Sequence, residues 1–286
     1  MNTSRLTLTC MLFTLLAALP AIAGPRTFVS GLGNDANPGT REQPKRTFAS
    51  ALTVTNPGGQ IVALDSAGYA SSTLTIDKSV SIIVPPGVAG FITVSGSNGI
   101  AINAAATDVV SIRGLIIETS ASSSGSGIVA NSVGPLSIED CTVRNFAEGI
   151  LFNPTNRGRL GVHDTTVRGC VFGIFVRNGG SALSSAVIDR ARLSGNDSGL
   201  FAYAQPSGSS VDVNMTDCIV TGGNSGIVAN RHSNAISTLV RVNNCIITDN
   251  NNGVVTFGGA QILSRGNNTL ERNTNGNDFA GSYSPK

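Results

Sequence analysis

LSIEDCTVRNFAEGILFN, residues 136–153, sets a pattern that recurs through the second half of the chain. Four later segments repeat it, namely RLGVHDTTVRGCVFGIFVR (159–177), SAVIDRARLSGNDSGLFAY (185–203), VNMTDCIVTGGNSGIVAN (213–230) and VRVNNCIITDNNNGVVTF (240–257). In each repeat, an apolar strand residue is followed six positions later by a glycine that opens another apolar strand. In the five segments the apolar residues are Val143, Val167, Leu193, Val220 and Ile247, and the glycines are Gly149, Gly173, Gly199, Gly226 and Gly253. Leu270 and Gly276 form a sixth pair after the last segment.

The repeats follow one another at intervals of 24, 26, 27, 27 and 23 residues. Such a period, with short β-branched segments and no helical pattern, is typical of a solenoid in which each repeat is one coil stacked on the next. Leucine-rich repeats share the period, but their spaced leucines are missing here. The sequence therefore predicts an all-β parallel β-helix of about eight or nine coils, each with a short apolar strand, a turn-rich stretch and a Gly-led strand.

The N-terminal region departs from the repeat. REQPKRTFASAL (41–52) places Phe48 and Leu52 at helical spacing after a proline, which predicts a short helix covering the open end of the solenoid. We expect residues 1–23 to be a signal peptide, 24–60 the N-terminal cap, 61–276 the β-helix and 277–286 a C-terminal tail.

The first 23 residues combine one basic residue, Arg5, with an apolar run and an Ala21-Ile22-Ala23 ending. This order is typical of a cleaved signal peptide and predicts a secreted or periplasmic protein with no membrane span after cleavage. Removing Arg5 from the total of 19 leaves 18 basic against 17 acidic side chains. Neither a charge run nor a basic stripe is present, so nucleic acid is not an expected partner.

Stacking of the coils places equivalent residues in rows along the axis. One row precedes the reference residue by two positions and is expected to face inward: Leu115, Cys141, Thr165, Ala191, Cys218, Cys245 and Asn268. Cysteine behaves in such a row as a small buried hydrophobe. Cys218 and Cys245 lie in adjacent coils, so a disulfide between them stays an open alternative.

The row one position earlier favours left-handed backbone at a sharp corner. Its members are Gly114, Asp140, Asp164, Arg190, Asp217, Asn244 and Asn267. Asp140 above Asp164 has the separation of a carboxylate pair in a retaining glycosidase. Because Arg190 follows them and offers charge compensation, we interpret this row as structural.

FVSGLGNDANPGT (28–40), QPKRTFASAL (43–52) and GGQIVAL (58–64), followed by the coils above, resemble the pectin-lyase-like superfamily of right-handed parallel β-helix proteins. The resemblance covers the mature chain and implies the fold. It does not imply one activity, because that superfamily contains lyases, hydrolases, epimerases, tailspikes and adhesins. The Asn-Thr-Asp, Gly-His-Gly and Arg-Ile-Lys runs of polygalacturonase-like hydrolases and the Arg-x-Pro-x-x-Arg setting of pectate lyases are missing.

A candidate ligand-binding row lies four positions after each glycine: Asn131, Asn153, Arg177, Tyr203, Asn230 and Phe257. We expect Arg177 and Tyr203 to meet in adjacent coils, with Arg231 and His232 beside Asn230. These residues suit a uronic acid or neutral sugar chain. For a lyase, His232 or Arg177 would be the base and Arg231 would neutralise the uronate carboxylate.

A second row, two positions after each glycine, is apolar: Val129, Leu151, Phe175, Phe201, Val228 and Val255. Strict alternation turns it outward, which predicts a partner surface or cover by the tail from Asn273 to Lys286. A bend at the glycine that buries the row is the alternative. The sequence thus favours a non-catalytic protein that binds polysaccharide or a cell-surface partner, with a polysaccharide lyase as the alternative. We expect no cofactor and no metal site; calcium stays an open alternative, although no motif for it is seen.

Overall fold

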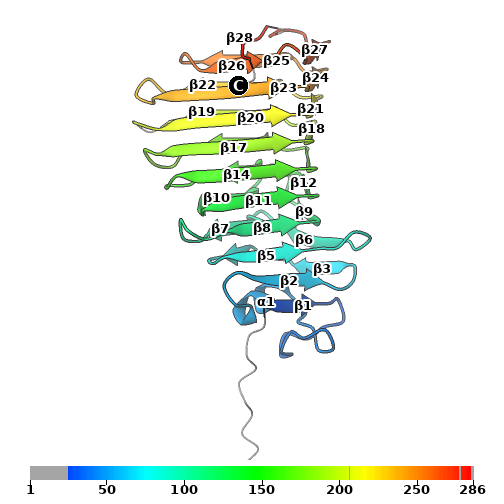
Figure 1. The fold of residues 1–286 in the computed structure, drawn as a ribbon. Helices are drawn as coiled ribbons and strands as arrows, with labels where there is room; N and C mark the ends of the chain where they lie inside the picture. Colours follow the sequence, from blue (N-terminus) through cyan, green and yellow to red (C-terminus); the bar gives the residue numbers. More distant parts are fainter. Residues whose placement is uncertain (1–24, 206, 277, 285–286) are drawn as a thin grey trace, which may run out of the picture.

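The computed structural model describes residues 25–205, 207–276 and 278–284, and here the chain winds into a parallel β-solenoid (Figure 1). The expected signal peptide, residues 1–23, lies outside the described residues. Each coil contributes one strand to each of three sheets, called A, B and C, and every strand pairing in the described part is parallel. Eight coils, from β2 to β25, are complete, as predicted.

The strands follow one another along the axis in the order given for each sheet. Sheet A contains β1 (Arg26–Val29), β2 (Gly59–Ala63), β5 (Val80–Ile83), β8 (Val110–Arg113), β11 (Pro135–Glu139), β14 (Gly158–His163), β17 (Leu183–Asp189), β20 (Ser210–Thr216), β23 (Ser237–Asn243), β26 (Gln261–Ser264) and β28 (Gly281–Ser282). Sheet B contains β3 (Ala67–Ala70), β6 (Gly90–Val94), β9 (Leu115–Thr119), β12 (Thr142–Arg144), β15 (Thr166–Arg168), β18 (Arg192–Ser194), β21 (Ile219–Thr221), β24 (Ile246–Thr248) and β27 (Thr269–Glu271). Sheet C contains β4 (Leu74–Ile76), β7 (Ile100–Asn103), β10 (Ser126–Ser132), β13 (Glu148–Phe152), β16 (Phe172–Arg177), β19 (Ser198–Ala204), β22 (Ser225–Arg231) and β25 (Asn252–Phe257).

The first apolar segment of each repeat, expected as one strand, is two strands in the structure. In LSIEDCTVR the chain leaves sheet A after Glu139 and enters sheet B at Thr142. Asp140, with φ of 53°, makes the turn between them. A single residue in the left-handed region therefore redirects the chain without interrupting the apolar pattern, which is why the sequence shows one continuous segment.

Two rows of left-handed residues form the corners of the solenoid. Between sheets A and B the positive φ angles belong to Gly114, Asp140, Asp164, Arg190, Asp217 and Asn244, as predicted, whereas at the last coil Gly266 takes this conformation instead of Asn267. Between sheets B and C a second row, not predicted, contains Asn145, Gly169, Gly195, Gly222, Asp249 and Arg272.

The inward row after the A–B corner is confirmed as a packing row. Cys141, Thr165, Ala191, Cys218 and Cys245 are each at most 2% exposed. The four cysteines of the described chain are free thiols, so the alternative of a disulfide between Cys218 and Cys245 is not realised here. Burial raises the pKa of Cys141 to about 12, which keeps that thiol protonated and unreactive.

The glycine six positions after each reference residue is required by close packing between coils. A Cβ at Gly149 would lie 2.3 Å from Val167 Cγ1 and 2.5 Å from the carbonyl oxygen of Gly173 in the next coil. The same clash with the next glycine carbonyl recurs at Gly199 and Gly226. Coils separated by about 4.8 Å leave no room for a side chain at this position.

Helix α1 (Phe48–Val54) covers the N-terminal end of the solenoid, as predicted. Thr47 accepts a hydrogen bond from the Ser50 backbone N–H at its start. Phe48 is fully buried, and its ring centroid lies 4.9 Å from that of Tyr69. The helix therefore closes the core with an aromatic side chain.

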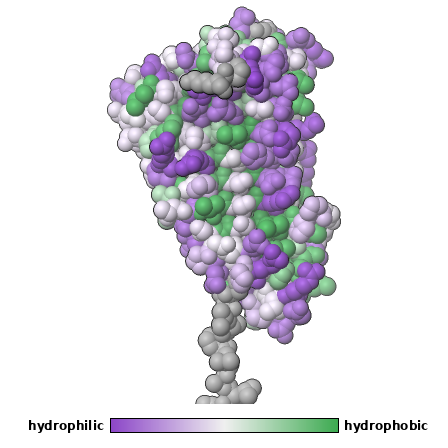
Figure 2. All heavy atoms as spheres, in the orientation of Figure 1, coloured by the Kyte–Doolittle hydropathy of each residue, from purple (hydrophilic) through white to green (hydrophobic). Residues whose placement is uncertain are grey.

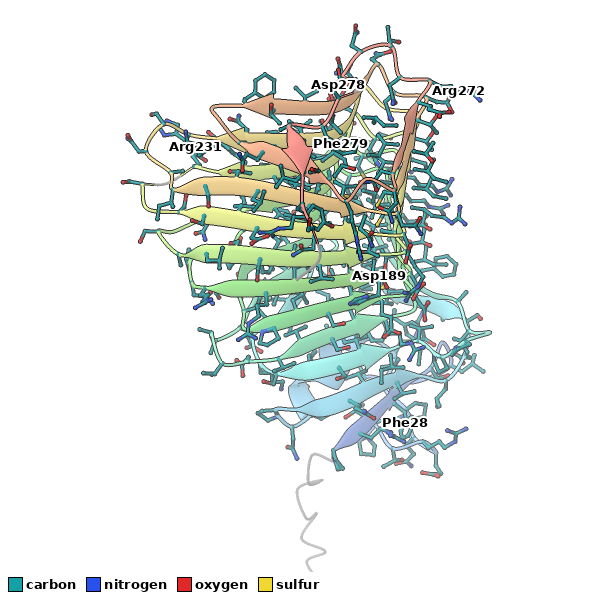
Figure 3. The ribbon with its side chains drawn as sticks, turned by 45° about the horizontal axis from the view of Figure 1, so that its top comes forward. Phe28, Asp189, Arg231, Arg272, Asp278 and Phe279 are labelled. Carbon is teal, nitrogen blue, oxygen red and sulfur yellow. The ribbon has the colours of Figure 1, made fainter. Side chains whose placement is uncertain are left out.

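At the other end the tail adds β28 to β26 in sheet A, and Phe279 packs against the core (Figure 3). The described part of the tail therefore lies at the C-terminal ends of two sheets, because Asn275 pairs with Asn252 of sheet C and β28 pairs with β26 of sheet A. It extends sheet C along the solenoid axis, and no described contact places it over the outward face of the apolar row. No helix in the described ranges has the length and apolar character needed to cross a membrane.

Candidate functional site

A hollow of about 470 Å³ opens where sheet C passes into sheet A. Asn153 follows β13, Arg177 ends β16, and the loops after β16, β19 and β22 complete the lining. The lining residues are Asn153, Arg177, Asn178, Gly179, Gln205 and His232. Four successive coils thus contribute to one surface depression, in the region that the sequence predicted.

Arg177 provides the positive charge of the hollow. Its guanidinium carbon lies 5.5 Å from the ring centroid of Phe175, which holds the charged group over an aromatic face. Its Nε atom is buried without a hydrogen-bond partner among the described residues, and so is Oδ1 of Asn153. Buried polar atoms normally have partners, so these two atoms are exceptions in the lining of the hollow.

Asn178 fixes the loop that forms one wall of the hollow. Its amide nitrogen donates to Ala182 O at 2.6 Å and to Ser184 Oγ at 3.1 Å, while its Oδ1 accepts from the Gly180 backbone N–H at 2.7 Å. These three hydrogen bonds all lie within the loop after β16 and the start of β17. Asn178 shapes the hollow and is not available to a ligand.

His232 lies at the rim and is exposed. Its backbone N–H donates to Ala204 O at 2.9 Å, and its Nδ1 accepts from the Asn234 backbone N–H at 3.4 Å. This long contact engages Nδ1 and leaves Nε2 without a described hydrogen-bond partner.

Tyr203 and Asn230 continue the row away from the hollow. Arg177 pairs with Tyr203, Tyr203 with Asn230, and Asn230 with Phe257 on successive strands of sheet C. The expected stacking in adjacent coils is therefore confirmed. Neither Tyr203 nor Asn230 lines the hollow itself.

Arg231 does not join this group. Its Nε donates to the carbonyl oxygen of Gly258 at 2.8 Å, so the side chain is bound to the loop of the next coil. Figure 3 shows Arg231 among the loops at this edge of the solenoid. The arrangement that would let Arg231 neutralise a carboxylate held by Arg177 is not present.

An aromatic cluster lies on the outward face of sheet C beside Arg177. The ring centroids of Phe175 and Phe201 are 4.9 Å apart, and Phe172 lies 5.1 Å from Phe175 and 5.3 Å from Phe201. Tyr203 extends the cluster, 5.9 Å from Phe201. Sequence reasoning missed Phe172, although it stands where other coils have Ser, Glu or Asn and so is the exception in its row.

The apolar row of sheet C points outward but is not an exposed stripe. Val129, Phe175 and Val228 are only 5–6% exposed, yet they do not belong to the continuous core cluster that contains their strand neighbours. Phe172 and Arg177 cover Phe175 within its own coil, whereas Leu151, Phe201 and Val255 are partly exposed. The row keeps the outward parity of strict alternation, so the alternative of a bend at the glycine is not realised.

The polar residues at the A–B corner are arranged differently. Arg190 binds Asp164 through two hydrogen bonds of 2.7 and 2.8 Å and also contacts Asp189. Arg113 lies 3.3 Å from Asp140. Hydrogen bonding to Arg190 lowers the pKa of Asp164. The two aspartates that resembled a catalytic pair are therefore each held by an arginine, which supports their structural interpretation.

Within the described ranges, no group of three or more His, Cys, Asp or Glu side chains is placed to hold a metal ion. His163, the second histidine of the chain, lies 3.6 Å from Asp189 on sheet A and belongs to the same paired corner. It does not approach the hollow that contains His232.

Residues 98–275 match the family model described as "Right handed beta helix region". The chain belongs to this right-handed β-helix family. The resemblance to pectin-lyase-like right-handed β-helix proteins that the sequence suggested is confirmed. Comparison with curated proteins found no match.

Three solved structures share the architecture of this right-handed β-helix protein. A pectate lyase, Pel9A, superposes with a TM-score of 0.63 at 14% identity over 91% of this chain and 78% of its own. The pectin methylesterase PemA from Erwinia chrysanthemi gives 0.52 at 10% identity over 81% and 80%. The pectin methylesterase from Aspergillus niger gives 0.51 at 12% identity over 91% and 90%. At these identities the similarity establishes the fold alone.

Proposed function

We propose that this protein binds a polysaccharide, or a glycan-bearing cell-surface component, along the outward face of sheet C. The observation that carries the proposal is the row of outward polar groups without partners beside the aromatic cluster. Arg177 Nε and Asn153 Oδ1 have none among the described residues, and no described contact engages the Tyr203 hydroxyl or the Asn230 side-chain amide. Rings that pack on sugar faces and groups that bond sugar hydroxyls or carboxylates are thus placed together.

The charge of the hollow favours a glycan with acidic groups. Arg177 offers planar N–H donors suited to a carboxylate, and Nε2 of His232 adds a polar group at the rim. The hollow has amides but no acidic side chain in its lining. A uronate-containing chain is therefore the first ligand to test, with neutral glycans as the comparison.

Binding without cleavage fits the described groups better than lyase chemistry. The proposed neutralising group, Arg231, does not line the hollow, and its Nε is bound to the next loop. We therefore place the lyase second. An increase in absorbance from unsaturated uronates, on incubation of the protein with uronate glycans with and without calcium, would establish the lyase instead.

Replacement of Arg177 tests the proposal directly. We expect Arg177→Met to weaken binding of oligogalacturonides by about 10- to 100-fold, because a charge-assisted hydrogen bond contributes about 1.5–3 kcal/mol. The measurement is isothermal titration calorimetry. Arg168→Met is the matched control, since Arg168 is an exposed arginine at the end of β15 on sheet B.

Equal losses of affinity in the two variants would indicate general electrostatic attraction and would show that Arg177 is not part of a specific binding site. Unchanged affinity in both would exclude this hollow as the binding surface. Circular dichroism of each variant checks that the solenoid is intact.

We also propose that residues 1–23 direct export. N-terminal sequencing of protein recovered outside the cytoplasm should begin at Gly24. A sequence beginning at Met1 would contradict this.

A further inference from the structure

Phe257 is an exposed aromatic side chain that the hollow and the aromatic cluster do not use. It is 53% exposed and ends β25, the last strand of sheet C. Exposed apolar side chains are common singly and need no explanation by themselves. The place of Phe257 in the register of sheet C gives it significance.

Phe257 stands in the same row as Tyr203. Strand pairing puts Phe257 beside Asn230 and Asn230 beside Tyr203, so two aromatic residues lie two coils apart with an amide between them. At about 4.8 Å per strand the two rings are roughly 10 Å apart along the solenoid axis. Along the row, the cation of Arg177 is therefore followed by the Tyr203 ring, the Asn230 amide and the Phe257 ring.

We propose that Phe257 forms a second stacking position, so that the site takes an oligosaccharide lying parallel to the solenoid axis. This inference rests on the proposed function and extends it. One pyranose ring packs on Tyr203, the next meets Asn230, and the third packs on Phe257, while the sugar at the other end meets Arg177 through a carboxylate or hydroxyl group.

The loop after Phe257 packs closely on the end of β22, and Phe257 itself stays 53% exposed. Gly258 and Gly259 both have positive φ, and the carbonyl oxygen of Gly258 accepts the hydrogen bond from Arg231. A Cβ at Gly258 would lie 1.9 Å from Arg231 O, so the loop cannot carry a side chain there. The chain turns away from the row directly after Phe257, and Arg231 anchors that turn instead of the ligand.

The test is the dependence of affinity on chain length. Oligogalacturonides and cello-oligosaccharides of two to six residues are titrated into the wild-type protein and into Phe257→Ala and Phe257→Leu. For the series that binds, we expect wild-type affinity to rise at least tenfold between the dimer and the tetramer. Both variants should lose most of that rise and bind the dimer like the wild type.

A second variant reports contact at this position. The chain contains no tryptophan, so Phe257→Trp introduces a single one. Its emission should shift to the blue with tetramers and longer chains but not with dimers. Val187→Trp, which places the single tryptophan at an exposed apolar position on sheet A, is the control for general surface effects.

The outcomes separate the two proposals. If neither series binds the wild type, the proposed function fails and this extension with it. If a series binds but dimer and hexamer have equal affinity, or Phe257→Ala keeps the full rise, the glycan site stands and the Phe257 position is wrong.

Discussion

The A–B corner and the C–A edge are both rich in polar side chains, but they use them differently. At the A–B corner the charges are paired with one another, as Arg190 is with Asp164. Figure 2 shows hydrophilic surface along the margin of the molecule on which the strands of sheet B lie in Figure 1. At the C–A edge, Arg177 Nε and Asn153 Oδ1 lack partners among the described residues. Pairing, more than polarity, distinguishes residues that hold the coil from residues available to a ligand.

The backbone shows the same contrast. From β11 onward, the connections from sheet A to sheet B through β24 are two residues long, of which the first is left-handed. The connections from sheet C to sheet A range from two residues, 133–134, to six, 104–109. A constant corner sets the register of the coils, and a variable edge can change shape without disturbing it.

The strongest test of the close packing between coils is the glycine at the second position of the sheet C strand. We expect Gly149→Ala to lower the free energy of unfolding by about 3 kcal/mol, because its Cβ would meet both a side chain and a backbone oxygen of the next coil. Gly68→Ala is the control, since a Cβ there meets nothing within 4 Å. Urea unfolding followed by circular dichroism measures both. Similar values for the two variants would show that the coils can separate to admit a side chain.

A smaller effect is expected from the left-handed corner itself. Asp217 has φ of 55°, so Asp217→Val should cost about 1–2 kcal/mol more than Asp217→Gly. Both variants lose the hydrogen bond from the Asn244 amide, and their difference isolates the backbone strain. Thermal unfolding measures this difference. If the valine variant were as stable as the glycine variant, the corner would not depend on its conformation.

The smallest effect concerns the charges at the corner. Because Arg190 lowers the folded-state pKa of Asp164, ionised Asp164 adds stability above its unfolded-state pKa of about 3.9. That contribution is lost as pH falls through the lower folded-state value. Asp164→Asn should therefore reduce the melting temperature near neutral pH and flatten its decline on the acid side. A double-mutant cycle with Arg190→Gln measures the coupling, and a cycle that shows none at pH 7 would contradict the pairing.

Much of the closed part of the solenoid could be predicted because each of its positions has one dominant physical requirement. Asp140 and its row need a residue that tolerates left-handed backbone, and Cys141 and its row need a small apolar one. The cap could be predicted from Phe48 and Leu52 for the same reason. Residue type and spacing were then sufficient.

The open edge was less predictable because its residues respond to neighbours in other coils. The nomination of Arg177 and His232 placed both in one hollow, yet Arg231, adjacent in sequence, turns to Gly258 through a loop whose geometry no spacing reveals. The outward apolar row followed alternation correctly, but the burial of Phe175 depends on Phe172 in the same coil. Phe279 packs against the core at the C-terminal end, and it could not be predicted because it lies in a segment outside the repeat.

The uniform A–B corner makes one coil a removable unit. Arg190 and Asp217 have nearly the same φ, 50° and 55°, so loss of residues 191–217 would join two equivalent corners. Such a deletion would set Arg177 directly beside Asn230, because both align with Tyr203. The interior would stay continuous, while the candidate ligand-binding row would lose one residue, Tyr203. Recombination between repeats in the gene would therefore lengthen or shorten the solenoid by one coil at a time, with the same corner at each junction.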